Sequence, residues 1–186
     1  MTTTLVIPGP IADEITAATH NPLESAGVLL ARRVETGKDV RLLSRALHWV
    51  PSSAYTERSQ YHMLIGSEGY VGALGAAETD RAIPIWFHTH PGDGAVPIPS
   101  KYDRQVDRDI SDLFQLRSGS AFYATLIASP QSDGFIFTGE ITPEGGQAVP
   151  IDRVWSVGER WRLLQNFTRD TTAPATIFDR IGRAHV

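Results

Sequence analysis

The 186-residue chain contains no cysteine. Disulfide bonds, thiolate zinc sites and cysteine nucleophiles are therefore excluded, and any bound metal has to be held by His, Asp or Glu. Basic residues are also few, because 17 Lys and Arg stand against 21 Asp and Glu, for a formal net charge of -4. A nucleic-acid-binding domain usually carries a basic stripe, so the charge balance predicts that nucleic acid is not a partner.

Long apolar runs are missing as well. No stretch approaches the roughly 20 apolar residues that a membrane-spanning helix needs, and Met1–Pro8 lacks the basic start and the apolar stretch of a signal peptide. We therefore expect a cytoplasmic protein without a membrane partner. With 41% apolar and 20% charged residues, the composition is that of a soluble protein with one sizeable core.

The apolar pattern changes repeatedly between strand and helix periods. Strands are predicted at Leu5–Ile7, Ala26–Ala31, Val40–Val50, Tyr61–Ile65 and Ile83–Phe87, and a last hairpin joins Ala121–Ala128 to Gly134–Gly139. Helices are predicted from Pro10 to His20, from Ser67 (as the cap) to Thr79, from Ser100 onward, and from Arg153 to Phe167. Hairpins followed by helices, without strict β-α-β alternation, predict an α+β fold with a mixed sheet.

The same pattern predicts one domain over residues 1–145, followed by a C-terminal helical extension over residues 146–186. The periodicity weakens over residues 168–186. We expect this last part to be partly flexible or to serve as an interaction tail.

Two histidines stand two positions apart where a predicted strand ends. Because side chains alternate along a strand, His88 and His90 should face one side and Thr89 the other. Two imidazole nitrogens aimed at one point make half of a tetrahedral zinc site. A His-x-His pair is common by chance, so the following residues matter. Pro91 directs the chain out of the strand, and a Gly- and Pro-rich loop lets it turn back.

Ser100 and Asp103 open the next predicted helix. Ser followed three residues later by an acidic residue resembles a capping box, a structural device, and without the histidines that interpretation would be preferred. With them, Asp103 adds a carboxylate, and two histidines plus one carboxylate leave the fourth position of a zinc ion open for water. The two interpretations are compatible, because a capped helix start is a rigid platform for a ligand.

A hydrolase with such a site needs a base, because zinc lowers the pKa of water to about 7 and a nearby carboxylate can carry the proton to the leaving amine. Glu24 is the best candidate, since it precedes the buried strand Ala26–Ala31 at a predicted sheet end. Without a metal site, Glu24 would be interpreted as a solvated loop residue after Asn21-Pro22.

Together these segments resemble a known motif. His88-Thr89-His90-Pro91 with Ser100-Lys101-Tyr102-Asp103 resembles the JAMM motif of the JAB/MPN/Mov34 metalloprotease family in its bacterial type, and Glu24–Leu30 resembles the family's catalytic glutamate and Gly-containing strand. The element order over residues 4–140 also fits. The resemblance implies a JAB/MPN domain over residues 1–145, with a mixed curved β-sheet flanked by helices and layered as in cytidine deaminases. One departure is the loop between His90 and Ser100, which holds nine residues where the family usually has seven.

The resemblance also implies roles for these residues. His88, His90 and Asp103 would bind Zn²⁺, Glu24 would act as general base and then as proton donor, and Ser100 would donate a hydrogen bond to the oxyanion. The expected enzyme is a zinc isopeptidase or peptidase that hydrolyses the bond after the C-terminal Gly of a ubiquitin-like or sulfur-carrier protein. An adenylating activating enzyme is a further expected partner.

Two alternatives stay open. A non-catalytic MPN-type scaffold is disfavoured because every expected ligand is present, and a RadC-like JAB protein, whose role concerns DNA, is disfavoured by the acidic balance. The remaining histidines are interpreted as structural or surface residues, namely His20, His48, His62 and His185. Tyr55 and Tyr102 could line a groove.

Overall fold

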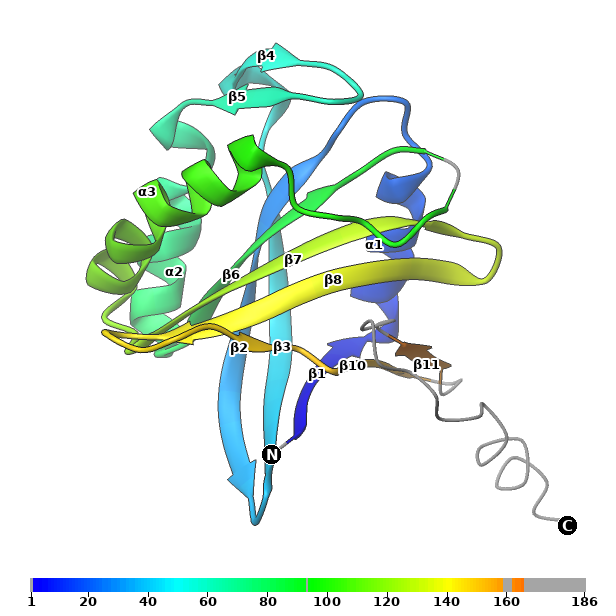
Figure 1. The fold of residues 1–186 in the computed structure, drawn as a ribbon. Helices are drawn as coiled ribbons and strands as arrows, with labels where there is room; N and C mark the ends of the chain where they lie inside the picture. The colour runs from blue at the N-terminus through cyan, green and yellow to red at the C-terminus, as the bar shows by residue number, and fades with distance from the viewer. Residues whose placement is uncertain (1, 93, 159–161, 166–186) are drawn as a thin grey trace, which may run out of the picture.

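The computed structural model describes residues 2–92, 94–158 and 162–165 (Figure 1). Within these residues, a curled mixed sheet of nine strands has the order β11-β10-β1-β3-β2-β6-β7-β8-β9. Its strands are β1 (Thr2–Pro8), β2 (Ala26–Thr36), β3 (Asp39–Trp49), β6 (Ile83–Thr89), β7 (Phe122–Gln131), β8 (Gly134–Pro143), β9 (Val149–Pro150), β10 (Arg153–Val157) and β11 (Arg162–Gln165). The α+β fold with a mixed curved sheet is confirmed.

Helices and a separate hairpin complete the described chain. The helices are α1 (Gly9–Thr19), α2 (Val71–Asp80) and α3 (Lys101–Ser118), with short 3-10 turns at Ser52–Ala54 and Ser67–Gly69. A separate antiparallel pair is formed by β4 (Tyr55–Arg58) and β5 (Met63–Ile65). None of the described helices is long and apolar enough to cross a membrane.

The central strands are buried on both faces, as their continuous apolar runs predict. In β6, Ile85 and Phe87 pack in a core with residues of α1, whereas Trp86 packs on the opposite face with residues of α2 and α3. In β2, Leu29 and Leu30 divide between the same two cores. Figure 1 shows α2 and α3 side by side and away from α1. The side chain that follows Trp86 by two residues therefore faces the α3 side.

Helix α3 connects the parallel strands β6 and β7 and is held against them by aromatic packing. Phe114 is fully buried, and its ring centroid lies 5.5 Å from that of Tyr70, 6.0 Å from Trp86 and 5.5 Å from Tyr123. Gly119 ends the helix with a φ of 64°, the left-handed conformation in which glycine carries no Cβ penalty. The start of α3 is thereby placed next to the end of β6.

Two local predictions need correction. The strand expected at Tyr61–Ile65 is the shorter β5 and pairs with β4 outside the main sheet. Ser67 does not cap a long helix: it starts a 3-10 turn, and α2 begins only at Val71, after Tyr70 adopts a φ of -132°. The break in the helical pattern lets the Tyr70 ring reach the aromatic cluster, so tertiary packing overrides the local propensity.

The predicted helix from Arg153 to Phe167 is wrong over its described residues, which form β10 and β11. β10 pairs in parallel with β1, with Val154 opposite Leu5, and both side chains are fully buried in the core. The buried Val154 and Ser156 alternate with more exposed neighbours, which is a period of two. The extension over residues 146–186 is therefore not helical where it is described. Residues 166–186 lie outside the described residues, so the flexibility expected there stays a prediction.

The substitution Phe114→Ala removes the ring at the centre of the aromatic cluster. We expect the free energy of unfolding to fall by about 3–5 kcal/mol, because the surrounding rings can close the vacated volume only in part. Denaturant unfolding followed by circular dichroism measures this change. Leu116→Ala is the control on the same helix, because Leu116 is 80% exposed and should shift the stability by no more than about 0.5 kcal/mol. Equal stabilities of the two variants would contradict the role of Phe114 as the centre of the aromatic cluster.

Candidate metal centre

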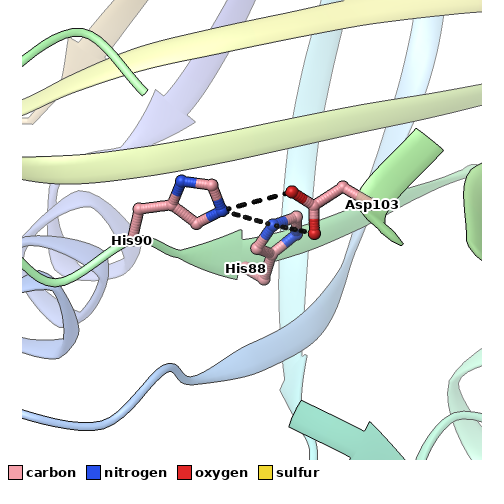
Figure 2. A group of neighbouring side chains, drawn as sticks. All are labelled: His88, His90 and Asp103. Carbon is pink, nitrogen blue, oxygen red and sulfur yellow. Dashed lines mark hydrogen bonds and ion pairs between the residues drawn. The ribbon is translucent and has the colours of Figure 1, made fainter. Parts of the chain in front are cut away.

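His88 and His90 lie at the end of β6, where their imidazoles face the start of α3 (Figure 2). Their Nε2 atoms are 3.2 Å apart. His88 is buried and His90 is partly exposed. Thr89 faces the other way, and its hydroxyl accepts a hydrogen bond of 2.9 Å from the backbone N–H of Ser25. The side-chain alternation expected from the sequence is confirmed.

Asp103, in the first turn of α3, completes the group. Its Oδ1 lies 3.4 Å from His88 Nε2 and its Oδ2 lies 3.5 Å from His90 Nε2. The capping box is also present, since the Ser100 backbone N–H donates to Asp103 Oδ2 at 2.6 Å and the Asp103 N–H donates to Ser100 Oγ at 3.0 Å. Both interpretations of this segment therefore hold, and the helix cap itself orients the carboxylate.

The three side chains fit a zinc ion. Their ligand atoms lie within 4.8 Å of one another, and the separations of 3.2, 3.4 and 3.5 Å can be compared with a tetrahedral site. Bonds of about 2.0–2.1 Å at tetrahedral angles place neighbouring ligand atoms about 3.3 Å apart. The two Nε2 atoms are therefore already spaced as two ligands of such an ion, and Asp103 holds Oδ1 and Oδ2 at similar distances from His88 and His90 respectively.

The protonation states also suit a metal. Burial lowers the pKa of His88 and outweighs the opposing effect of Asp103, which favours the neutral imidazole that coordinates metals. Burial alone would raise the pKa of Asp103, but hydrogen bonds from His88 and His90 outweigh it and hold that pKa well below its usual range. His88 Nδ1 is buried without a hydrogen-bond partner among the described residues.

Glu24 lies just before β2 and is buried, with 6% of its surface exposed. Its Oε1 is 4.0 Å from His90 Nε2. Burial raises the pKa of Glu24 to about 7, with His90 acting to lower it and Asp103 to raise it. A carboxyl group with this pKa can both accept and release a proton near neutral pH.

Side chains of β4 hold the backbone around Glu24 in place. Arg58 donates from Nε to the Glu24 carbonyl at 2.5 Å and from Nη2 to Ser25 Oγ at 2.7 Å, while its guanidinium lies 4.5 Å from the centre of the Tyr55 ring. The Tyr55 hydroxyl in turn accepts a hydrogen bond from the Ala26 N–H. Sequence reasoning missed Arg58, because nothing local marks a contact across 34 residues.

The long loop between His90 and Ser100 is anchored on the β7–β8 hairpin. The Gly94 carbonyl accepts a hydrogen bond of 2.7 Å from the Gln131 side chain, and the Pro97 carbonyl accepts one of 2.6 Å from the Thr138 hydroxyl. Gly94 has a φ of 81°, and a Cβ there would lie 2.7 Å from the Pro130 carbonyl oxygen. Residues 94–99, the described part of the loop that leads into α3, are thus fixed against the β7–β8 hairpin before the chain reaches Ser100.

A cavity of about 230 Å³ opens beside the metal centre. Glu24, His88 and Asp103 line one end of it, and Tyr102 and His62 line it too, with their ring centroids 4.7 Å apart. Tyr102 therefore lines a cavity, as the sequence suggested it could, and His62, predicted to be a structural or surface residue, lines the same cavity while staying partly exposed.

Comparison with known proteins assigns the chain to a family. Residues 11–134 match the sequence profile of the prokaryotic homologues of the JAB domain, a match that includes every residue discussed above as a ligand or base. The chain belongs to this family. The family includes metalloproteases, and the His88–His90–Asp103 group could hold their metal. The resemblance that the sequence motifs indicate is confirmed at the level of the family.

One solved structure to which the chain is similar is that of protein DSY2949 from Desulfitobacterium hafniense. It is 17% identical, and the similarity covers 79% of this chain and 88% of that chain with a TM-score of 0.49. No curated protein matches the chain. Membership of the JAB-domain family therefore rests on the sequence match.

Metal analysis tests the three proposed ligands. Protein prepared without chelator should contain about one zinc per chain, and His88→Ala should lose it, because two of three ligands no longer form a tight site. Elemental analysis measures the metal and circular dichroism the fold. His48→Ala, at an exposed position of β3, is the matched control and should keep its zinc. Unchanged zinc in His88→Ala would remove this residue from the ligand set.

Proposed function

We propose that this JAB-domain protein is a zinc metallopeptidase. One observation carries the proposal: two imidazoles and an ionised carboxylate converge on one point, and a buried glutamate lies 4.0 Å from one of the imidazoles. That is the combination of an open metal site and a proton carrier that hydrolysis of an amide bond requires. A non-catalytic scaffold would need neither the ligand geometry nor a buried glutamate.

The bound zinc would supply a Lewis acid that polarises the scissile carbonyl and lowers the pKa of water. Glu24 then removes the proton from the attacking water as the carbon–oxygen bond forms. The same carboxyl group delivers that proton to the leaving amine as the carbon–nitrogen bond breaks, so the proton count closes over one turnover. A pKa near 7 suits both transfers.

Ser100 would stabilise the negative charge that develops on the carbonyl oxygen. Its Oγ accepts the hydrogen bond from the Asp103 N–H, and accepting this bond uses a lone pair rather than the hydroxyl proton. The hydroxyl can therefore still donate to an oxyanion. The capping box uses a lone pair of Ser100 Oγ, whereas the proposed catalytic role uses the hydroxyl proton.

The substrate in this proposal is the tail of a ubiquitin-like or sulfur-carrier protein, cleaved after its C-terminal Gly. Resemblance to the JAMM motif suggests it, and an extended tail can reach a metal centre by pairing with a strand edge. The β5 strand supplies Met63, Leu64 and Ile65 to the wall of the cavity beside the metal. An adenylating enzyme that activates the same small protein is the further partner we propose.

The substitution Glu24→Gln tests the base. Zinc content should stay near one per chain, while kcat/KM should fall by about 10²–10⁴-fold, the usual contribution of a general acid–base group. The assay uses a Gly-ending ubiquitin-like protein fused through its C-terminus to a reporter, with the cleaved bond located by mass spectrometry. Glu78→Gln, exposed on α2, is the control. Full activity in Glu24→Gln would exclude Glu24 as the base, and a zinc-loaded protein that cleaves no such fusion would favour the scaffold.

The substitution Ser100→Gly separates capping from catalysis. Glycine is a tolerable N-cap, so the free energy of unfolding should fall by only a few tenths of a kcal/mol, about 0.3. Loss of the hydroxyl should lower kcat by about 10²–10³-fold, as for other oxyanion donors, whereas Ser100→Thr keeps a hydroxyl and should retain most activity. Thermal unfolding and steady-state kinetics measure the two effects. An active Ser100→Gly enzyme would show that the residue is only a cap.

A further inference from the structure

The cavity beside the candidate metal centre has a lining of mixed character. Glu24, His88 and Asp103 belong to it. Its apolar lining comes from α3, β5 and β6, and includes Met63, Ile65, Trp86, Val106 and Ile110. At about 230 Å³ it is smaller than the roughly 300–1,000 Å³ of a typical small-molecule site. It has room for one long side chain rather than for an organic cofactor.

Asp107 lines the same cavity from α3, one turn after Asp103. Side chains four apart on a helix share a face, which explains why both carboxylates reach the cavity. The Tyr123 hydroxyl donates to Asp107 Oδ1 at 3.1 Å, and an ionised carboxylate can accept several such bonds. Neither catalysis nor metal binding, as proposed above, uses Asp107.

The cavity lining around Asp107 carries negative charge that no Lys or Arg of the described lining neutralises. Asp109 also lines the cavity, and the described lining residues include no Lys or Arg. Burial raises the pKa of Asp107 to about 6, opposed by the Tyr123 hydrogen bond and assisted by the charges of Glu140 and Asp103. The carboxyl group is therefore still mostly ionised at pH 7.5. A bound metal would offset Asp103, but Asp107 is not part of the ligand group.

We propose that this cavity binds a lysine or arginine side chain of the peptide substrate close to the scissile bond. The aliphatic stem would pack against Met63, Ile65 and Val106, and the cationic end would bind the Asp107 carboxylate. A cavity with apolar lining residues and a carboxylate among them complements a side chain that has an apolar stem and a charged tip. The bound nitrogen keeps its charge, so it is distinct from the acylated nitrogen of an isopeptide bond.

This inference rests on the proposed function and narrows it to substrates with a basic residue near the cleaved bond. It is tested without turnover, by NMR titration of the ¹⁵N-labelled, zinc-loaded Glu24→Gln protein. The probes are six-residue alanine peptides carrying lysine, norleucine or glutamate at the third position. Lysine should bind about tenfold more tightly than norleucine, which corresponds to about 1.4 kcal/mol, and glutamate most weakly. The perturbed amides should lie in β5 and α3.

A second set of variants assigns the preference to Asp107. Asp107→Asn, made in the same protein, can still accept the Tyr123 hydrogen bond. It should abolish the lysine preference, so that the lysine and norleucine peptides bind about equally well. Asp107→Glu keeps the charge and should preserve the preference. Asp112→Asn, exposed on the same helix, removes one charge elsewhere and should leave the preference unchanged. Equal binding of the lysine and norleucine peptides to the starting protein, no binding of the lysine peptide, or a preference that survives Asp107→Asn would each overturn the proposal.

The outcome is separate from that of the peptidase assay. A lysine preference lost in Asp107→Asn supports the binding site even if the reporter fusions are not cleaved, because the titration measures equilibrium binding alone. Conversely, cleavage of fusions with no lysine preference in the titration supports the peptidase and rejects the proposed role of Asp107.

Discussion

The contact between the end of β6 and the first turn of α3 is the constraint on which the metal centre depends. Parallel strands need a crossover, and α3 provides it between β6 and β7. The buried ring of Phe114 holds the helix against the sheet, and the capping box orients Asp103 toward both imidazoles. A strand end and a helix start, each rigid for its own reason, therefore meet with their three candidate ligand atoms within 4.8 Å of one another.

Burial shifts the pKa values of the groups around this contact, downward for His88 and upward for Glu24. It keeps His88 neutral and raises the pKa of Glu24 to about 7, because the charged form of each group is disfavoured away from water. Asp103 remains ionised because two imidazoles donate hydrogen bonds to it. One small volume thus holds a neutral histidine, an ionised aspartate and a carboxyl group able to exchange a proton. Amide hydrolysis at a metal requires these states together.

The β4–β5 hairpin links the metal centre to the surface that a substrate would meet. Arg58, at the end of β4, bonds the backbone around Glu24, while Met63 and Ile65 of β5 line the cavity next to the metal. The same small element therefore positions Glu24 and contributes to the wall of the cavity. Asp107 on α3 adds the carboxylate that, in our proposal, would distinguish one substrate side chain from another.

Local patterns in the sequence determined β2, β6, the start of α3 and the side on which His88 and His90 lie, because strand periodicity and helix caps act over a few neighbouring residues. They failed where a distant partner decides the structure. Trp155 and its neighbours suggested a helix, yet pairing with β1 makes them a strand, and no nearby residue marks Arg58 or Asp107 as part of the site. Sequence alone thus named the candidate metal ligands and the proposed base. Only the tertiary structure set their distances, the pKa of Glu24 and the cavity beside them, since burial and contacts between remote residues exist only in the folded chain.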